Sequence, residues 1–192
     1  QSSIARAGIE PARFFGVGIG VAGIINSQTG VVRNSPFFGW RDVPLAEIVG
    51  RHTHLPVFVE NDVNTLTLTE QLFGVGRRYN DFIVVTIGRG IGMGIVIDGR
   101  LYPGANGGAG ELGHTTLAGD VISEHPGYLE ELAADPGVLR AVNAGLPNDS
   151  PPYAILEEVI AAAQAGVPAA RVALAASGER VGIAIANAVN LL

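Results

Sequence analysis

The sequence predicts an α/β protein. Short apolar runs rich in β-branched residues, such as 55–59, are typical of buried strands, and Ala-rich stretches such as 171–192 are typical of helices. Hydrophobic residues make up 47% of the chain and charged residues 16%, so its 192 residues can bury a core. That length suits one domain or two small lobes.

The predicted strands and helices alternate along most of the chain. Strands are predicted at residues 14–21, at 24–32 around a polar turn, and at 55–59, 81–87, 95–97 and 100–102. Helices are predicted at residues 43–49, 65–73, 128–134, 153–165 and 171–192. Asp98 and Gly99 are a strong hairpin-turn signal. Asp42 is expected to cap the helix at 43–49, with Pro44 in its first turn.

A boundary between two lobes is predicted at residues 74–80, where Gly, two Arg, Tyr and Asn interrupt the apolar pattern. Residues 1–76 would then belong to an N-terminal lobe and 77–192 to a C-terminal lobe. Gln1 is not a natural start, and Leu192 leaves an apolar side chain at the other end. We therefore expect a piece of a longer protein.

Charge and missing residue types exclude several classes of function. The net charge is −6, and all 12 basic residues are arginine. Without lysine there is no P-loop lysine, no Schiff-base lysine and no polybasic membrane patch. The acidic balance argues against this segment gripping nucleic acid itself. Without cysteine there are no disulfides, thiolate zinc sites or cysteine nucleophiles, which fits a reducing cytoplasm.

No signal peptide is visible, and no membrane segment is expected. Residues 14–32 are apolar, but Gly, Asn, Ser, Gln and Thr interrupt them. This composition indicates strands and turns and not a membrane span.

The stretch from Glu60 to Asn64 places an amide and a carboxylate where a strand gives way to a helix. In open α/β sheets, ligands bind at that edge. Asn61 and Asp62 are therefore candidates for ligand binding. Either residue could instead simply cap the following helix, and this stretch alone favours neither interpretation.

Residues 88–94 form a glycine loop between two predicted strands. The loop is not a dinucleotide fingerprint, because Met93 stands at the sixth position from Gly88 and a strand follows where the fingerprint needs a helix. Consecutive N–H groups in such a loop can bind phosphate. A tight hairpin without a ligand is the alternative.

Glu111 and His114 place a carboxylate and an imidazole close together in a second glycine-rich loop. Acid–base chemistry, sugar recognition and metal binding are all compatible with this pair. From the spacing alone, a surface Glu and a structural His are the favoured interpretation. His52 and His54 are expected to be solvated, and His125 with His114 would still lack a third metal ligand.

Several segments, taken in order, resemble the ROK family (repressors, open reading frames, kinases), whose members have the actin-like ATPase, or ribonuclease H-like, fold. The match runs from about Phe14 to Ala133, in the family's order and at nearly its spacing. The matching segments are Gly16–Gly23, Gly39–Leu45, Leu55–Asn64, Phe73–Gly74, Gly88–Gly94, Asp98–Leu101 and Gly104–His114. The resemblance implies part of a two-lobed ROK domain.

The same resemblance implies a sugar site. The positions that match sugar-binding residues of the family are Gly23, Asn61, Asp62, Glu111, His114 and Glu130. In the family's kinases the residue that corresponds to Asp62 is the general base. Carboxylates and amides bind vicinal hydroxyls in paired hydrogen bonds, which fits this role.

The chain departs from the family at its zinc motif, C-x-C-G-x-x-G-C-x-E, which aligns best with residues 121–130. Val121, Ser123 and Tyr128 stand at the three cysteine positions, and only Gly127 and Glu130 match. We therefore expect no zinc, and zinc then cannot help to fix His114.

A second departure lies in the glycine loop, whose implied phosphate-binding residues are Gly88, Arg89, Gly90 and Gly92. Arg89 replaces the threonine that is usual in the kinases. An arginine could contact a phosphate, or it could fill the nucleotide cleft, which resembles the regulator branch more. The kinases' N-terminal phosphate motif, with its magnesium-linked Asp, and the C-terminal part of the adenosine pocket do not occur in these residues, so ATP and Mg²⁺ are expected only if the protein is a kinase.

The resulting prediction is a sugar-sensing effector domain of a ROK-type transcriptional regulator, cytoplasmic and not an enzyme. A hexose or derivative would bind in a cleft between the lobes, and closure about residues 74–80 would reorient the DNA-binding domains of a homodimer. DNA would be contacted only through an N-terminal helix-turn-helix outside this sequence. The alternatives are a truncated ATP-dependent sugar kinase similar to glucokinases, with Asp62 as general base, and a degenerate, ligand-free dimerisation module.

Overall fold

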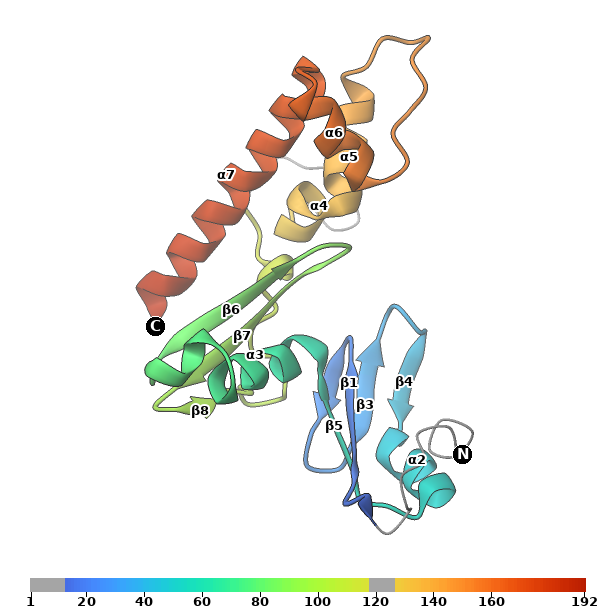
Figure 1. Cartoon of the computed structure of the whole chain (residues 1–192), viewed down its shortest axis with the longest axis vertical. Helices are drawn as coiled ribbons and strands as arrows, with labels where there is room; N and C mark the ends of the chain where they lie inside the picture. Colours follow the sequence, from blue (N-terminus) through green and yellow to red (C-terminus); the bar gives the residue numbers. More distant parts are fainter. Residues whose placement is uncertain (1–12, 118–126) are drawn as a thin grey trace. The chain divides into compact units, whose positions relative to one another are not determined.

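The computed structural model describes residues 13–117 and 127–192 (Figure 1). The chain forms two compact units. Unit 1 takes in Gln1–Val84 and Met93–Gly110, and unit 2 takes in Val85–Gly92 and Glu111–Leu192. Strands and helices are both present, which confirms the predicted α/β class. These compact units are not the same as the two predicted lobes, so the lobe boundary expected between residues 76 and 77 stays a prediction.

Unit 1 is built on a parallel pair of strands and an antiparallel sheet. The strands are β1 (Val17–Val21) beside β5 (Val57–Asn61), and β2 (Ile24–Asn26), β3 (Val31–Ser35) and β4 (Trp40–Val43) in that order. Their buried core consists of Val21, Ile25, Val32 and Val59. Burial of one such aliphatic side chain contributes roughly 1.5–3 kcal/mol, so this cluster holds the two sheets together.

Two helices and a 3₁₀ turn complete this part of unit 1: α2 (Leu45–Thr53), α3 (Asp62–Leu72) and η2 (Val75–Arg78). The predicted cap of α2 is wrong. Pro44 is the N-cap and makes no side-chain hydrogen bond, while Asp42 pairs with Arg33 at 3.0 Å. Asp42 still belongs to β4, so the neighbouring strand β3 supplies its partner, and it lies too far before the helix to reach the free N–H groups.

The third sheet consists of β6 (Phe82–Ile87), β7 (Ile91–Ile97) and β8 (Arg100–Leu101) in that order. Asp98 and Gly99 have φ of 51° and 70°, as a two-residue type I′ hairpin requires, which confirms the predicted turn. The predicted glycine loop is too long, because Gly92 and Gly94 lie within β7. Gly94 lies so close to α3 that a Cβ there would overlap the side chain of Thr67, which explains why this position of the strand is a glycine.

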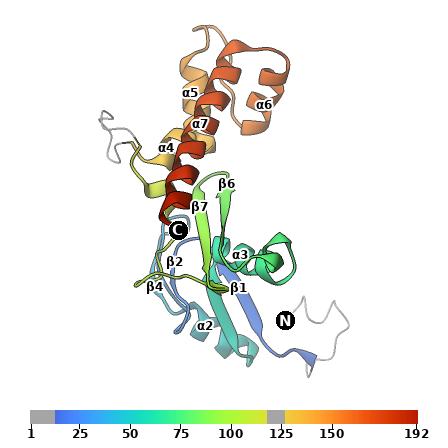
Figure 2. The same ribbon diagram turned by 90° about the vertical axis from the view of Figure 1, so that its left-hand side faces the viewer.

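Unit 2 contains a helical cluster around the long helix α7 (Figures 1 and 2). Its helices are α4 (Leu129–Ala133), α5 (Asp135–Ala144), α6 (Leu156–Gln164) and α7 (Pro168–Leu191). The first three all contact α7. Ser177 of α7 donates to the carbonyl oxygen of Ala133 at 2.8 Å, and Arg180 donates to that of Leu132 at 3.2 Å. These bonds satisfy carbonyl groups that the end of α4 leaves free.

Helix α7 is also long and apolar enough, by length and composition alone, to cross a membrane. Its buried positions recur every three or four residues, at Ala170, Ala173, Ser177, Val181, Ala184 and Ala188. One stripe at this spacing is typical of a helix that packs against other helices in a globular domain. Within unit 2, Ala170 and Ala173 pack in one core cluster with residues of α5 and α6, and Ser177 bonds the end of α4.

Helix α5 is not among the helices predicted from the sequence. Pro136 and Gly137 suggest a break, but Pro136 lies in the first turn, where its missing N–H has no helical partner to lose. Gly137 is buried, and a Cβ there would overlap the carbonyl oxygen of Glu131. This glycine is therefore needed for the tight passage from α4 to α5.

Gly137 and Gly182, two helical glycines of unit 2, differ in their surroundings and should respond in opposite ways to substitution by alanine. Gly137→Ala should lower the free energy of unfolding by about 1–3 kcal/mol, because the added methyl group has no room. Gly182→Ala in α7 meets no atom within 4 Å and should raise it by about 0.5–1 kcal/mol. Urea unfolding of the two variants measures both changes, and shifts of the same sign would contradict the packing described for α5.

Candidate functional site

The carboxyl ends of β1 and β5 lie at the same edge of the parallel pair, with Val21 opposite Asn61. The side-chain amide of Asn61 donates from Nδ2 to the carbonyl oxygen of Gly23 at 3.0 Å. Gly23 has φ of 133°, and a Cβ there would overlap the carbonyl oxygen of Asn34. Only glycine fits this turn, and its carbonyl oxygen holds the side-chain amide of Asn61 in place.

Asn61 caps helix α3. Its Oδ1 accepts the N–H groups of Val63 at 2.8 Å and Asn64 at 3.0 Å. An amide oxygen has two lone pairs and an amide nitrogen two hydrogens, so the bond to Gly23 leaves one N–H for a ligand. The cap interpretation of Asn61 is confirmed, and its capacity for a ligand is a single donor.

Asp62 is the first residue of α3 and is exposed. Its Oδ1 accepts the N–H of Val63 at 3.0 Å. Among the described residues no group bonds Oδ2. Asp62 therefore presents an open acceptor at the sheet edge, whereas Asn61 is mostly committed to holding the backbone.

Glu60 holds together the residues around the start of α3, a role that is not predicted from the sequence. Its Oε1 accepts the N–H of Asn61 at 2.8 Å and the side-chain amide of Asn64 at 3.0 Å, and its Oε2 accepts the hydroxyl of Ser27 at 2.6 Å. Asn64 is only 6% exposed, so its amide depends on this bond. The sequence feature that could have indicated this role is the position of Glu60, a carboxylate at the end of an otherwise apolar strand.

In unit 2, Glu111 and His114 form a pair. The 3₁₀ helix η3 (Leu112–His114) places Oε2 of Glu111 3.2 Å from Nδ1 of His114. At this distance the two groups can form an ion pair when the imidazole is protonated. The side chains remain 41% and 57% exposed, which leaves both open to solvent. The structural and the ligand-binding interpretations of this pair remain compatible with the geometry.

Glu130 lies on α4 against the glycine loop. Its Oε2 accepts the N–H of Ile91 at 2.9 Å, and a Cβ on Gly90 would come within 2.8 Å of the same oxygen. On the other side of the loop, the N–H of Asp135 donates to the carbonyl oxygen of Gly88 at 2.9 Å. The start of α4 and the start of α5 thus hold the loop, an arrangement that the sequence analysis did not predict.

Two backbone N–H groups of the glycine loop donate hydrogen bonds within the protein. The N–H of Gly88 donates to the carbonyl oxygen of Gly90 at 3.0 Å, and that of Ile91 is bound by Glu130. A phosphate would have to rely on the other donors of the loop. Arg89 is exposed between the two strands. Phosphate binding by Gly88, Arg89, Gly90 and Gly92 stays a prediction.

The absence of zinc beside His114 stays a prediction, and the described residues offer no set of zinc ligands there. Structural zinc sites are built from cysteine and histidine, and the sequence has no cysteine. Within residues 13–117 and 127–192 no three His, Asp or Glu side chains gather in a way that could hold a metal ion. Val121, Ser123 and His125 lie outside the described residues. Tyr128, at a cysteine position of the motif, instead lies beside His114, with ring centroids 5.6 Å apart.

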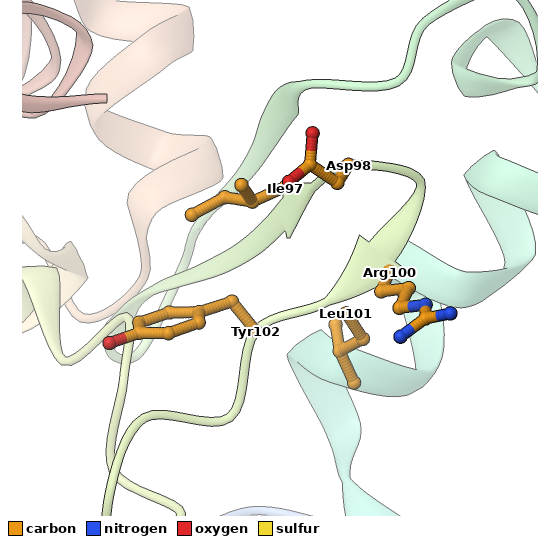
Figure 3. Close-up of a pocket in the computed structure, with 5 residues that line it drawn as sticks. All are labelled: Ile97, Asp98, Arg100, Leu101 and Tyr102. Carbon is orange, nitrogen blue, oxygen red and sulfur yellow. The ribbon is translucent and has the colours of Figure 1, made fainter.

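A surface pocket on the β7–β8 hairpin contains none of the predicted site residues (Figure 3). Its lining residues are Ile97, Asp98, Arg100, Leu101 and Tyr102. The side chains of Arg100 and Tyr102 point in opposite directions. Binding sites usually show a few polar groups that converge, so this pocket is not a candidate.

The structure thus brings Gly23, Asn61 and Asp62 together in unit 1, and Glu111 with His114 in unit 2, where Glu130 contacts the glycine loop. His52 and His54 are exposed, as expected. The role of each site residue in sugar binding stays a prediction.

Comparison with known proteins identifies relatives in two functional classes. A xylose repressor from Caldicellulosiruptor bescii is 36% identical over 203 aligned residues, which cover 100% of this chain and 51% of the repressor. A solved ROK family transcriptional regulator, a homologue of the E. coli MLC protein, matches with a TM-score of 0.88 and 31% identity over 100% of this chain and 50% of its own. A ROK family glucokinase from Streptomyces griseus, solved with glucose and AMPPNP, matches with a TM-score of 0.83 and 28% identity over 100% of this chain and 66% of its own.

The chain spans about half the length of the xylose repressor that it matches. Its similarity to the two solved ROK proteins confirms the predicted actin-like ATPase fold. The sequence pattern of the ROK family matches residues 3–192, nearly the whole chain. The chain therefore belongs to the ROK family.

Proposed function

We propose that the chain is the sugar-sensing effector domain of a ROK-type transcriptional regulator and binds a hexose or a related sugar. The observation that carries this proposal is the exposed carboxylate of Asp62, held at the β1–β5 edge with an open acceptor oxygen. Neighbouring hydroxyls of a sugar are donors that such a carboxylate binds well.

The residues next to Asp62 hold its backbone in place before any ligand binds. Asn61 fixes the start of α3 and keeps one N–H for a sugar oxygen. Glu60 holds both this backbone and the turn at Ser27 in place. In unit 2, Glu111 and His114 offer a second group that can both donate and accept, because the imidazole of His114 has two nitrogen atoms. Each group would bond sugar hydroxyls.

One observation favours a regulator over a kinase. Arg89 stands where the ROK kinases that the chain resembles usually carry threonine. The name of the xylose repressor brings xylose, a pentose, into consideration beside the hexoses. The similarity to a glucokinase keeps the kinase as the second candidate, with Asp62 as general base.

The sugar would act by shifting a conformational equilibrium of the full-length protein. A ligand that binds one conformation more tightly raises its population, and operator affinity then changes by the difference between the two conformations. The net charge of −6 fits DNA contacts made by a part of the protein outside this sequence. A cytoplasmic homodimer belongs to the same proposal.

Asp62→Ala should weaken sugar binding by roughly 10- to 100-fold, because hydrogen bonds to a charged group contribute about 1.5–3 kcal/mol. Calorimetric titration with a panel of hexoses, N-acetylhexosamines and xylose measures this change. Asp149→Ala, at an exposed loop position, is the matched control and should bind like the unmodified chain. Equal affinities for both variants would remove Asp62 from the site.

Glu60→Ala should lower the free energy of unfolding by about 1–3 kcal/mol, because the buried amide of Asn64 loses its acceptor. Sugar affinity should fall with it, since the start of α3 is no longer held. Glu60→Gln keeps an acceptor oxygen and should retain most of the stability. Chemical denaturation and calorimetry measure the two effects, and a Glu60→Ala protein with unchanged stability would argue against this organising role.

The full-length protein should change its operator affinity when the bound sugar is added and should not release ADP from ATP in its presence. A coupled ADP assay and a DNA-binding titration measure the two properties. Sugar-dependent ADP release that disappears in Asp62→Asn would establish the kinase alternative. If Asp62→Ala and Glu111→Ala left every regulatory readout unchanged, the ligand-free dimerisation module would be the better description.

A further inference from the structure

The chain that follows His114 returns to lie beside it. Thr116 and Tyr128 form an antiparallel β-bridge. On either side of this bridge, the N–H of Leu117 donates to the carbonyl oxygen of Gly127 at 2.9 Å, and that of Leu129 donates to that of Thr115 at 2.9 Å. These backbone bonds bring Tyr128 close to the end of η3, although the two are separate in sequence.

The backbone of Tyr128 is tied to buried neighbours. Leu129 is completely buried at 0% exposure, and Gly127 is buried with φ of 74°, a conformation that favours glycine. Leu112, in η3, is buried as well, and η3 contacts α4. The backbone at Tyr128 is therefore anchored to the core of unit 2.

Two contacts act on the imidazole of His114 from different directions. The carboxylate of Glu111 lies 3.2 Å from Nδ1, at one edge of the ring. The ring of Tyr128 lies at a centroid distance of 5.6 Å with an angle of 43° between the planes. A polar contact at one edge and an aromatic contact together restrict both the rotation and the tilt of an exposed ring.

We propose that Tyr128 is a positioning residue that, together with Glu111, fixes the imidazole of His114 without a metal ion. A carboxylate beside Nδ1 favours the tautomer with its hydrogen on Nδ1, and in that tautomer Nε2 is an acceptor for a sugar hydroxyl. The absence of cysteine from the sequence means that no thiolate-bound zinc supports this ring, and within the described part of the chain no cluster of His, Asp and Glu could hold a metal ion. The inference deepens the proposed function, since His114 is one of the residues assigned to the sugar.

Nitrogen-15 NMR of the histidine rings tests the proposal without any sugar. The chain has 4 histidines, so loss of one signal in His114→Gln assigns that residue. The unmodified chain and Tyr128→Phe should show His114 with its hydrogen on Nδ1. Tyr128→Leu should shift His114 toward the mixture of tautomers expected for the exposed His54, which serves as the internal reference. If Tyr128→Leu does not fold, Tyr128→Met takes its place.

A second readout is the affinity for the sugar that binds the unmodified chain. Tyr128→Leu should weaken it roughly two- to tenfold, whereas Tyr128→Phe and the control Tyr79→Leu, an exposed tyrosine in unit 1, should leave it unchanged. EDTA should change neither the melting temperature nor the His114 signal. An Nδ1–H tautomer that persists in Tyr128→Leu, or one equivalent of zinc found by elemental analysis, would overturn the proposal. If no sugar binds, the NMR result alone decides it, and the proposed function fails separately.

Discussion

The parallel register of β1 with β5 is the constraint on which the site in unit 1 depends. Because Val21 lies opposite Asn61, the glycine turn after one strand meets the helix start after the other. The bond from Asn61 to Gly23 exists only in this register, and a shift by one residue would turn the side chains of β5 to the opposite face. Asp62 owes its exposed position to the same arrangement.

Glu60 shows how a group of polar residues can be stable at the end of an apolar strand. Its two oxygens accept three hydrogen bonds, from a turn hydroxyl, a backbone amide and a nearly buried side-chain amide. A partly buried polar network of this kind is favourable only when its members are satisfied. The side chain of Asn61 is mostly used by its bonds to Gly23, Val63 and Asn64, whereas Oδ2 of Asp62 stays open to a ligand.

In unit 2, polar groups are held by contacts with the short helix α4. Glu130 of α4 accepts the N–H of Ile91 in the glycine loop, and Tyr128, just before α4, contacts the imidazole of His114. Small side chains along α7 allow α4, α5 and α6 to pack closely on it. The ROK fold serves both repressors and sugar kinases, so function depends on how these few groups are used and not on the fold itself.

The sequence alone determined the α/β class, the family, the Asp98–Gly99 turn and the residues worth inspecting, because alternating apolar runs, turn residues and ordered motifs are local signals. It did not reveal α5, because Pro136 and Gly137 fit a first helical turn only when α4 packs before them. It gave Asp42 the wrong partner, since Arg33 lies on a neighbouring strand. Only the tertiary structure decided that Asn61 is mainly a cap, that Glu60 organises the corner, that Glu130 holds the glycine loop and that Tyr128 lies beside His114. The cap itself is a local contact, but the bonds from Asn61 to Gly23, from Ser27 to Glu60 and from Ile91 to Glu130, and the contact of Tyr128 with His114, join segments apart in sequence, which no local pattern encodes.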